Sequence, residues 1–222
     1  MMEEEGFGIT VPFQEDEWRS ISGKLVREIG CVLGIDRRGK ELTPMLIIPV
    51  VVRKQPIALI KAKLQKDEGL SYINTNDSEI KTKGLFPFDY VERKMLKKGK
   101  YDWIVLVEGQ RDALRLIMHG IPALAILGAR SWSEKKQRLL LSLGKSVVLA
   151  MDGDAAGRKA NKDIKAALGR QTKVKVLNLS KEAKRLGEKV DPGNMDKFYI
   201  KQLQELNESS AELNGKKLKK YR

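Results

Sequence analysis

The chain has 222 residues, enough for one large domain or two small ones, and its 41% of hydrophobic residues predicts a folded core. Its 43 lysines and arginines outnumber 29 acidic residues, and the net charge of +14 favours a polyanionic partner such as nucleic acid. One cysteine (Cys31) and one histidine (His119) exclude an intramolecular disulfide and a zinc site built from Cys and His.

The first part of the chain is mixed and polar, with Trp18 as the expected hydrophobic anchor. Residues 23–35 fit either a short helix or a pair of strands, and the pattern does not decide between them. Residues 44–52 and 56–64 are both largely apolar segments that favour β-structure, and three polar residues separate them, which predicts a β-hairpin. Cys31 lies among apolar residues and is expected in the core.

Further elements follow before residue 101. Residues 70–75 are expected to add a strand, and the polar run 76–84 is expected to be a loop. Residues 87–100 predict a helix, because Pro87 lies near its start and lysines gather near its end.

From residue 101 the pattern becomes an alternation of strands and helices. The predicted strands are 103–107, 123–127, 146–151 and 174–179, and the predicted helices are 111–120, 133–144 and 155–169. We expect Ser133 to cap the second helix and His119 to lie at the end of the first. Such alternation predicts a parallel sheet flanked by helices. The tail, 196–222, can begin as a helix and ends in a basic run.

Carboxylates follow the predicted strands. Glu108 follows the strand 103–107, Asp152 and Asp154 follow 146–151, and Asp191 comes after 174–179. Asp112 lies in the first turn of the helix after Glu108. Because ligands bind at the carboxyl ends of parallel strands, we expect these acids to converge at one edge of the sheet.

Carboxylates that lie this close repel each other unless a cation binds between them, so we expect a bound cation. With only oxygen ligands available, a hard ion such as Mg²⁺ is expected, with Mn²⁺ as a substitute and no zinc. A simpler interpretation is open for Asp112 and Asp154, which can stabilise a helix N-terminus through its dipole.

Three segments in this order, LVEGQRDAL (106–114), MDGDAAGRKA (151–160) and VDPGNM (190–195), resemble the TOPRIM domain of bacterial-type primases, topoisomerases and some nucleases. The chain is most similar to primases, particularly the primase part of phage primase–helicases. The third segment departs from many relatives, because Gly193 or Asn194 stands where they carry a second acid.

The resemblance extends to a basic subdomain that precedes TOPRIM in primases. It implies that Lys61, Lys63, Lys81 and Lys83 bind template and nucleotides, although ordinary solvated lysines are the alternative. We expect three regions: an α+β basic subdomain (1–100), a TOPRIM catalytic domain (101–195) and a C-terminal helix with a basic tail (196–222). The zinc-binding and helicase domains of such primases are not expected in this sequence.

The resemblance implies a DNA primase that makes short RNA primers on single-stranded DNA from ribonucleoside triphosphates. The resemblance implies that the catalytic residues are Glu108, Asp112, Asp152 and Asp154. It also implies that the metal is bound by Glu108, Asp152, Asp154 and Asp191. Gly109, Arg158 and Lys159 would contact nucleotide or DNA.

A replicative helicase or a separate template-recognition factor is the expected partner. The expected location is the cytoplasm, of a bacterial host if the chain is phage-encoded. No apolar run approaches the ~20 residues of a membrane span. A TOPRIM nuclease and a non-catalytic nucleotide- or DNA-binding module remain the alternatives.

Overall fold

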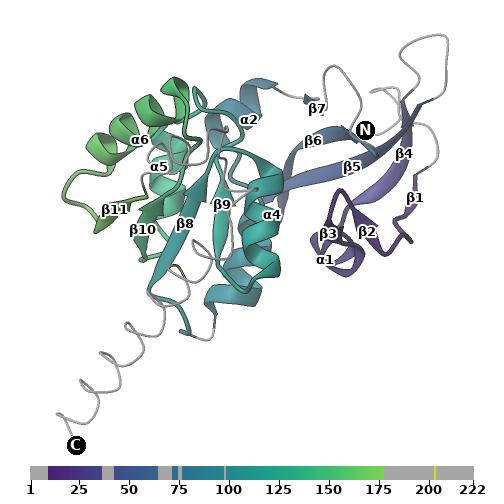
Figure 1. Cartoon of the computed structure of the whole chain (residues 1–222), viewed down its shortest axis with the longest axis horizontal. Helices are drawn as coiled ribbons and strands as arrows, with labels where there is room; N and C mark the ends of the chain where they lie inside the picture. Colours follow the sequence, from purple (N-terminus) through teal and green to yellow (C-terminus); the bar gives the residue numbers. More distant parts are fainter. Residues whose placement is uncertain are drawn as a thin grey trace, which may run out of the picture.

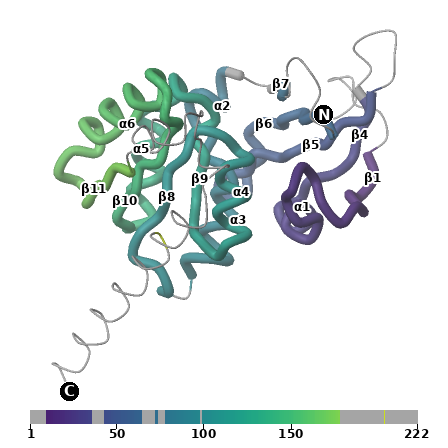
Figure 2. The backbone as a smooth tube through the Cα atoms, in the orientation of Figure 1, coloured from purple at the N-terminus to yellow at the C-terminus, as the bar shows by residue number. Residues whose placement is uncertain are grey.

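The computed structural model describes residues 10–36, 43–64, 72–74, 77–97, 99–177 and 203. Its strands form two main sheets that lie side by side as two lobes (Figures 1 and 2). The first sheet is antiparallel and has the order β1-β4-β5-β6-β7, whereas the second is parallel and has the order β11-β10-β8-β9. This α/β architecture, with a smaller mixed lobe before the parallel sheet, confirms the predicted fold class.

The antiparallel lobe is built around the predicted hairpin. Its five strands are β1 (Val11–Pro12), β4 (Val32–Asp36), β5 (Thr43–Val52), β6 (Gln55–Lys63) and β7 (Tyr72–Asn74). The turn from β5 to β6 uses positive φ angles at Arg53 (53°) and Lys54 (65°). The buried carboxylate of Asp89 accepts hydrogen bonds from both turn amides, at 2.6 and 2.8 Å, and so fixes the turn.

The ambiguous segment 23–35 contains both a helix and a strand. Helix α1 (Gly23–Ile29) follows a small ribbon of β2 (Glu17–Trp18) and β3 (Ile21–Ser22), and it ends at Gly30 with φ of 91°. The chain then enters β4. Trp18 and Cys31 are buried, as predicted, with 2% and 3% of their surface exposed.

The prediction of a loop over 76–84 is wrong, because helix α2 (Asp77–Lys83) occupies this stretch. Ile80 is its buried anchor, and Glu79 and Lys83 pair one turn apart at 2.6 Å. A single apolar residue in so short a segment leaves no periodicity to detect. The helix predicted over 87–100 is present as α3 (Phe88–Tyr90) continued by the π-helical turn η1 (Val91–Leu96).

The parallel lobe follows the predicted alternation element by element. Its strands are β8 (Trp103–Val107), β9 (Ala123–Ala125), β10 (Ser146–Leu149) and β11 (Val174–Val176), and its helices are α4 (Gln110–Met118), α5 (Glu134–Leu141) and α6 (Ala155–Leu168). The Ser133 hydroxyl caps α5 by accepting from the Lys136 amide, and His119 is the C-cap of α4, both as predicted. All five residues of β8 are buried, which puts this strand at the centre of the core.

The strand order decides which helices share a face. The chain moves from β8 to β9 through α4, and then back across the sheet to β10 and β11 through α5 and α6. With right-handed crossovers, α4 covers one face and α5 and α6 cover the other (Figure 1). Phe86 bridges to Ala125 with two backbone hydrogen bonds, so the segment between the lobes pairs with the edge strand β9.

Two predictions fall on the tail. The helix and basic run expected over 196–222 lie outside the described residues, apart from Leu203. Within the described part of the chain, no helix is long and apolar enough to cross a membrane.

Candidate functional site

The carboxyl ends of β8 and β10 bring two acidic segments to one edge of the parallel sheet. The two strands are paired neighbours, with Leu106 opposite Leu149. Glu108 follows β8 and Asp152 follows β10, two and three residues beyond that pair. Both acids are half-buried, so they are supported by the fold while part of their surface is exposed to solvent. The predicted meeting of these two segments at one sheet edge is therefore present.

The backbone of Glu108 is held by the loop that follows β9. The amides of Leu127 and Gly128 both donate to the Glu108 carbonyl, at 2.9 and 3.2 Å. Leu127 has a φ of 64° and Gly128 a φ of 120°, which turns both amides toward the same acceptor. The position of Glu108 thus depends on a tight turn contributed by the neighbouring strand.

That turn is locked by a buried lysine that sequence reasoning missed. The Ile126 carbonyl accepts hydrogen bonds from the Ser131 hydroxyl at 2.5 Å and from the Lys136 ammonium at 2.6 Å. Lys136 is fully buried, and burial lowers its pKa to about 7. The sequence signal for its burial was its position four residues before Leu140, which is also buried, because residues at this spacing lie on the same face of a helix.

Asp112 stabilises the start of α4. Its Oδ2 accepts a hydrogen bond from the Gly109 amide at 3.1 Å. A Cβ on Gly109 would lie 2.7 Å from the same oxygen, so this close approach favours glycine. The interpretation of Asp112 as a helix N-terminal acid therefore holds, and its carboxylate lies one turn after Glu108.

Asp152 and Asp154 lie in a tight loop between β10 and α6. Asp154 is the N-cap of α6, and its Oδ1 accepts from the Gly157 amide at 2.8 Å. A Cβ on Gly157 would lie 2.1 Å from the Asp152 carbonyl, so glycine is required for the loop to pack on the helix. Oδ1 of Asp152 is itself buried. The cap and the packing together fix two carboxylates that would repel each other without a cation.

The two basic residues of this segment have different surroundings. The Arg158 guanidinium donates to the Gly153 carbonyl at 2.7 Å and so braces the loop between the two acids. Lys159 forms an exposed ion pair with Asp163 at 2.5 Å, one helical turn further along. Arg158 therefore stabilises the acidic loop, whereas Lys159 pairs with a residue of the same helix, α6.

The donors at this edge suit a hard cation. Glu108, Asp152 and Asp154 offer carboxylate oxygens only, which fits Mg²⁺ or Mn²⁺ better than a softer metal. No group of three acidic, His or Cys side chains within the described residues forms a ready-made metal site. Asp191, the fourth predicted ligand, lies outside the described residues.

The antiparallel lobe approaches the start of α4 through Tyr72 of β7. Burial raises the pKa of the Tyr72 hydroxyl, and the nearby Arg19 opposes this effect. Arg111 and Asp112 of α4 also act on Tyr72, so they lie close to it. The Arg19 guanidinium lies over the rings of Trp18 and Tyr72, at 5.6 and 5.5 Å from their centroids. Tyr72 therefore lies near two arginines and near Asp112, and sequence reasoning missed both arginines because they come from separate segments.

The four predicted nucleic-acid-binding lysines differ in exposure. Lys81 is exposed, Lys63 and Lys83 are half-buried, and Lys61 is only 1% exposed. Lys83 forms its ion pair with Glu79 on α2. Their contacts to nucleic acid remain a prediction, with Lys81 the most accessible of the four.

Comparison with known proteins agrees with this description. Residues 105–189 match the family of Toprim-like domains, so the part of the chain that carries the acidic edge is similar to that family. The chain is also 33% identical over 118 residues to a DNA primase of Aquifex aeolicus, which is 53% of this chain and 24% of that protein. The chain thus spans about a quarter of the length of this curated relative.

Solved primase structures share the fold across both lobes. The Aquifex aeolicus primase structure, with zinc-binding and RNA polymerase domains, matches with a TM-score of 0.55 at 26% identity, covering 79% of this chain and 43% of that one. The RNA polymerase domain of Mycobacterium tuberculosis primase matches with a TM-score of 0.58 at 22% identity, covering 85% and 72%. The likeness in fold therefore includes the antiparallel lobe as well as the parallel lobe.

Proposed function

We propose that this chain is the catalytic core of a DNA primase, which synthesises short RNA primers on single-stranded DNA. One observation carries the proposal: the acids after β8 and β10 meet at one sheet edge, beside an arginine-bearing lobe, in a chain similar to DNA primases. In nucleotidyl transfer a hydroxyl forms a bond to the α-phosphorus of a nucleoside triphosphate as pyrophosphate leaves, so carboxylates that can hold cations beside these phosphates suit the reaction.

Each acid has its own role in this proposal. Asp152 and Asp154 hold the cation, with Asp191 as a further ligand, and Glu108 organises the metal or moves the proton of the attacking hydroxyl. Asp112 supports Glu108 through the start of α4. A bound Mg²⁺ would supply charge stabilisation for the attacking and leaving oxygens.

The basic residues would hold the polyanions. Arg19 and Arg111 lie near Tyr72, as does Asp112 at the start of α4, and they are suited to the phosphates of an incoming ribonucleotide, because guanidinium groups bind phosphate with two parallel hydrogen bonds. Lys63, Lys81 and Lys83 would hold the template. A replicative helicase or a template-recognition factor would deliver that template, in the cytoplasm.

Primer synthesis tests this proposal. Single-stranded DNA of mixed sequence is incubated with labelled ribonucleotides, with Mg²⁺ and then Mn²⁺, and products are separated by length. Asp152→Asn removes one carboxylate charge at the edge, whereas Asp163→Asn removes an exposed carboxylate on α6 and serves as the matched control. We expect short products from the parent and the control, and at least about a 100-fold loss in Asp152→Asn.

Other results would contradict the proposal. Degradation of the DNA that depends on Asp152, with no synthesis, would identify a TOPRIM nuclease. If neither reaction occurs, with or without a cognate helicase, while nucleotides still bind, the chain is a binding module and the proposal is wrong.

A further inference from the structure

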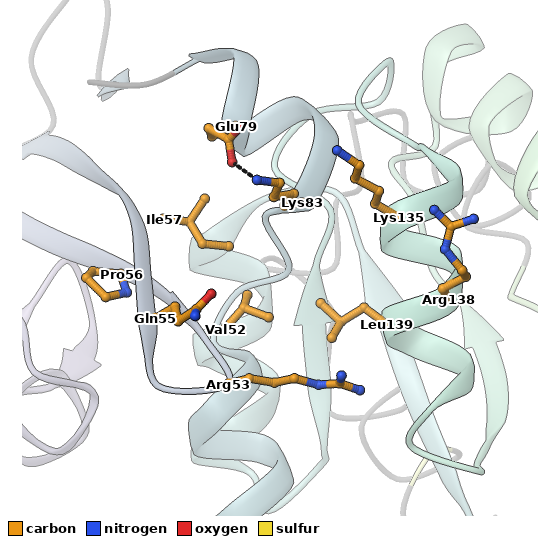
Figure 3. Close-up of a pocket in the computed structure, with 10 residues that line it drawn as sticks. All are labelled: Val52, Arg53, Gln55, Pro56, Ile57, Glu79, Lys83, Lys135, Arg138 and Leu139. Atoms are coloured by element: carbon orange, nitrogen blue, oxygen red, sulfur yellow. Dashed lines mark ion pairs between the residues drawn. The ribbon is translucent and has the colours of Figure 1, made fainter.

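A groove of about 670 Å³ lies between the two lobes, away from the acidic edge. Its walls come from the β5–β6 turn, α2 and α5, which Figure 3 shows facing a shared space. The lining residues are Val52, Arg53, Gln55, Pro56, Ile57, Glu79, Lys83, Lys135, Arg138 and Leu139. None of the predicted catalytic acids is among them, and α5 lies on the face of the sheet opposite α4.

The groove is strongly basic on both walls. Arg53 and Lys83 come from the antiparallel lobe and α2, and Lys135 and Arg138 come from α5 (Figure 3). Glu79, the one carboxylate among the described lining residues, pairs with Lys83 at 2.6 Å. Of the lining residues that the structure describes, four are therefore cationic and one is acidic.

The cations of α5 are available to a ligand. Arg138 pairs with Glu134 at 3.3 Å, but both side chains are largely exposed, at 67% and 85%, so the pair is weak. Lys135 makes no hydrogen bond or ion pair within the described part of the chain. A phosphate can thus bind either cation without displacing a strong internal partner.

The walls are held in place before any ligand binds. Arg53 donates to the Ser142 hydroxyl at 2.9 Å, which ties the hairpin to α5. The Ser133 hydroxyl donates to the Thr82 carbonyl at 2.5 Å, which ties α5 to α2. The groove is therefore preorganised, and binding to it requires little reordering.

The lining indicates the kind of ligand. The cations are spread along two walls, which suits a chain of singly charged phosphates better than one compact triphosphate. Val52, Ile57 and Leu139 give an apolar floor suited to sugars and base edges. Among the described residues, no aromatic side chain lines the groove, which leaves it without a base-stacking platform there, and binding should be independent of sequence.

We propose that this groove binds the backbone of a single-stranded nucleic acid, as a second contact site remote from the acidic edge. The inference rests on the proposed primase function, which supplies the strand as template or primer. The groove would hold that strand through phosphates while the acidic edge carries out chemistry.

Salt dependence of binding tests the groove directly. A short fluorescein-labelled oligonucleotide of mixed sequence is titrated with the whole chain, without divalent metal, between about 50 and 200 mM salt, and anisotropy gives the affinity. The groove variant is Lys135→Ala with Arg138→Ala. The control, Lys162→Ala with Lys165→Ala, removes the same charge at the same spacing from exposed positions on α6.

Loss of two phosphate contacts should reduce the slope of log affinity against log salt by about 1.4 in the groove variant. The control should retain the parent slope. Equal slopes in both variants, or a parent slope in the groove variant, would overturn the proposal. Loss of binding to a fluorescent ATP analogue, with oligonucleotide binding intact, would also overturn it and indicate a small-nucleotide site.

The same experiment separates this inference from the proposed activity. Asp152→Asn should bind the oligonucleotide with the parent slope, because the groove contains none of the catalytic acids. If groove binding holds but no primers form, the proposed function fails and the nucleic-acid site remains. If primers form while the groove variant binds normally, only the groove assignment fails.

Discussion

Lys136→Met should change how the stability of the protein depends on pH. Burial lowers the pKa of Lys136 from its ordinary value of 10.5 to about 7 in the folded chain. Between these two values the unfolded chain binds a proton that the folded chain has released. The free energy of unfolding therefore rises with pH across this interval, and below about pH 7 the cost of burying the charge is fully present.

The size of the effect follows from the two pKa values. Because each pKa unit corresponds to about 1.36 kcal/mol, Lys136 alone should add about 2 kcal/mol to the free energy of unfolding between pH 7 and pH 9. Methionine is similar in length and does not titrate. The Ile126 carbonyl keeps its hydrogen bond from Ser131, so the turn beside Glu108 should survive.

Denaturant unfolding at pH 7, 8 and 9 measures the difference between the parent and Lys136→Met. The Tyr72, Tyr90 and Cys31 groups have raised pKa values and are common to both proteins, so they cancel in the difference. Lys135→Met, at the exposed neighbouring position, should keep the parent rise. Parallel curves for the parent and Lys136→Met would refute the argument that burial lowers the pKa of this lysine.

Three further substitutions test the site and its supports. Asp154→Ala should lower the free energy of unfolding by about 1 kcal/mol, because α6 loses its N-cap. Asp154→Asn should keep the thermal stability of the parent but not its primer synthesis. Equal stability of the two variants would contradict the role of Asp154 as a cap. Gly157→Ala should destabilise the chain and reduce primer synthesis, because the new Cβ would clash with the Asp152 carbonyl. Helix propensity alone would instead raise the free energy of unfolding by about 1 kcal/mol, and such a rise would contradict this packing. Asp89→Ala should cost about 1–3 kcal/mol in denaturant unfolding, because two turn amides lose their acceptor, and an unchanged midpoint would show that the turn does not depend on it.

The parallel lobe could be predicted from sequence because its signals are local. The strand over 103–107 is a continuous apolar run, and the helices around it begin or end at Ser133 and Gly169, which have strong local preferences. Their alternation places the carboxyl ends of β8 and β10 at one edge. Glu108 and Asp152 could therefore be placed at the same edge of the sheet from the sequence alone.

The parts that were missed depend on contacts between distant segments. Helix α2 is stabilised by one buried residue, Ile80, and by its packing beside α5, which leave no periodic pattern. Lys136 looks like a solvated lysine in sequence, and only the fold buries it beneath the loop after β9. Arg19 and Arg111 are far apart in the chain, and the approach of β7 to α4 brings both near Tyr72.

We propose that the acidic edge joins ribonucleotides in the order dictated by a template. The most direct measurement compares primers made on two single-stranded DNAs of complementary sequence, with Mg²⁺ and all four ribonucleotides, and sequences the products. The account predicts products complementary to each template, absent with Asp152→Asn and present with Asp163→Asn. Identical products on both templates, or products that persist in Asp152→Asn, would contradict it.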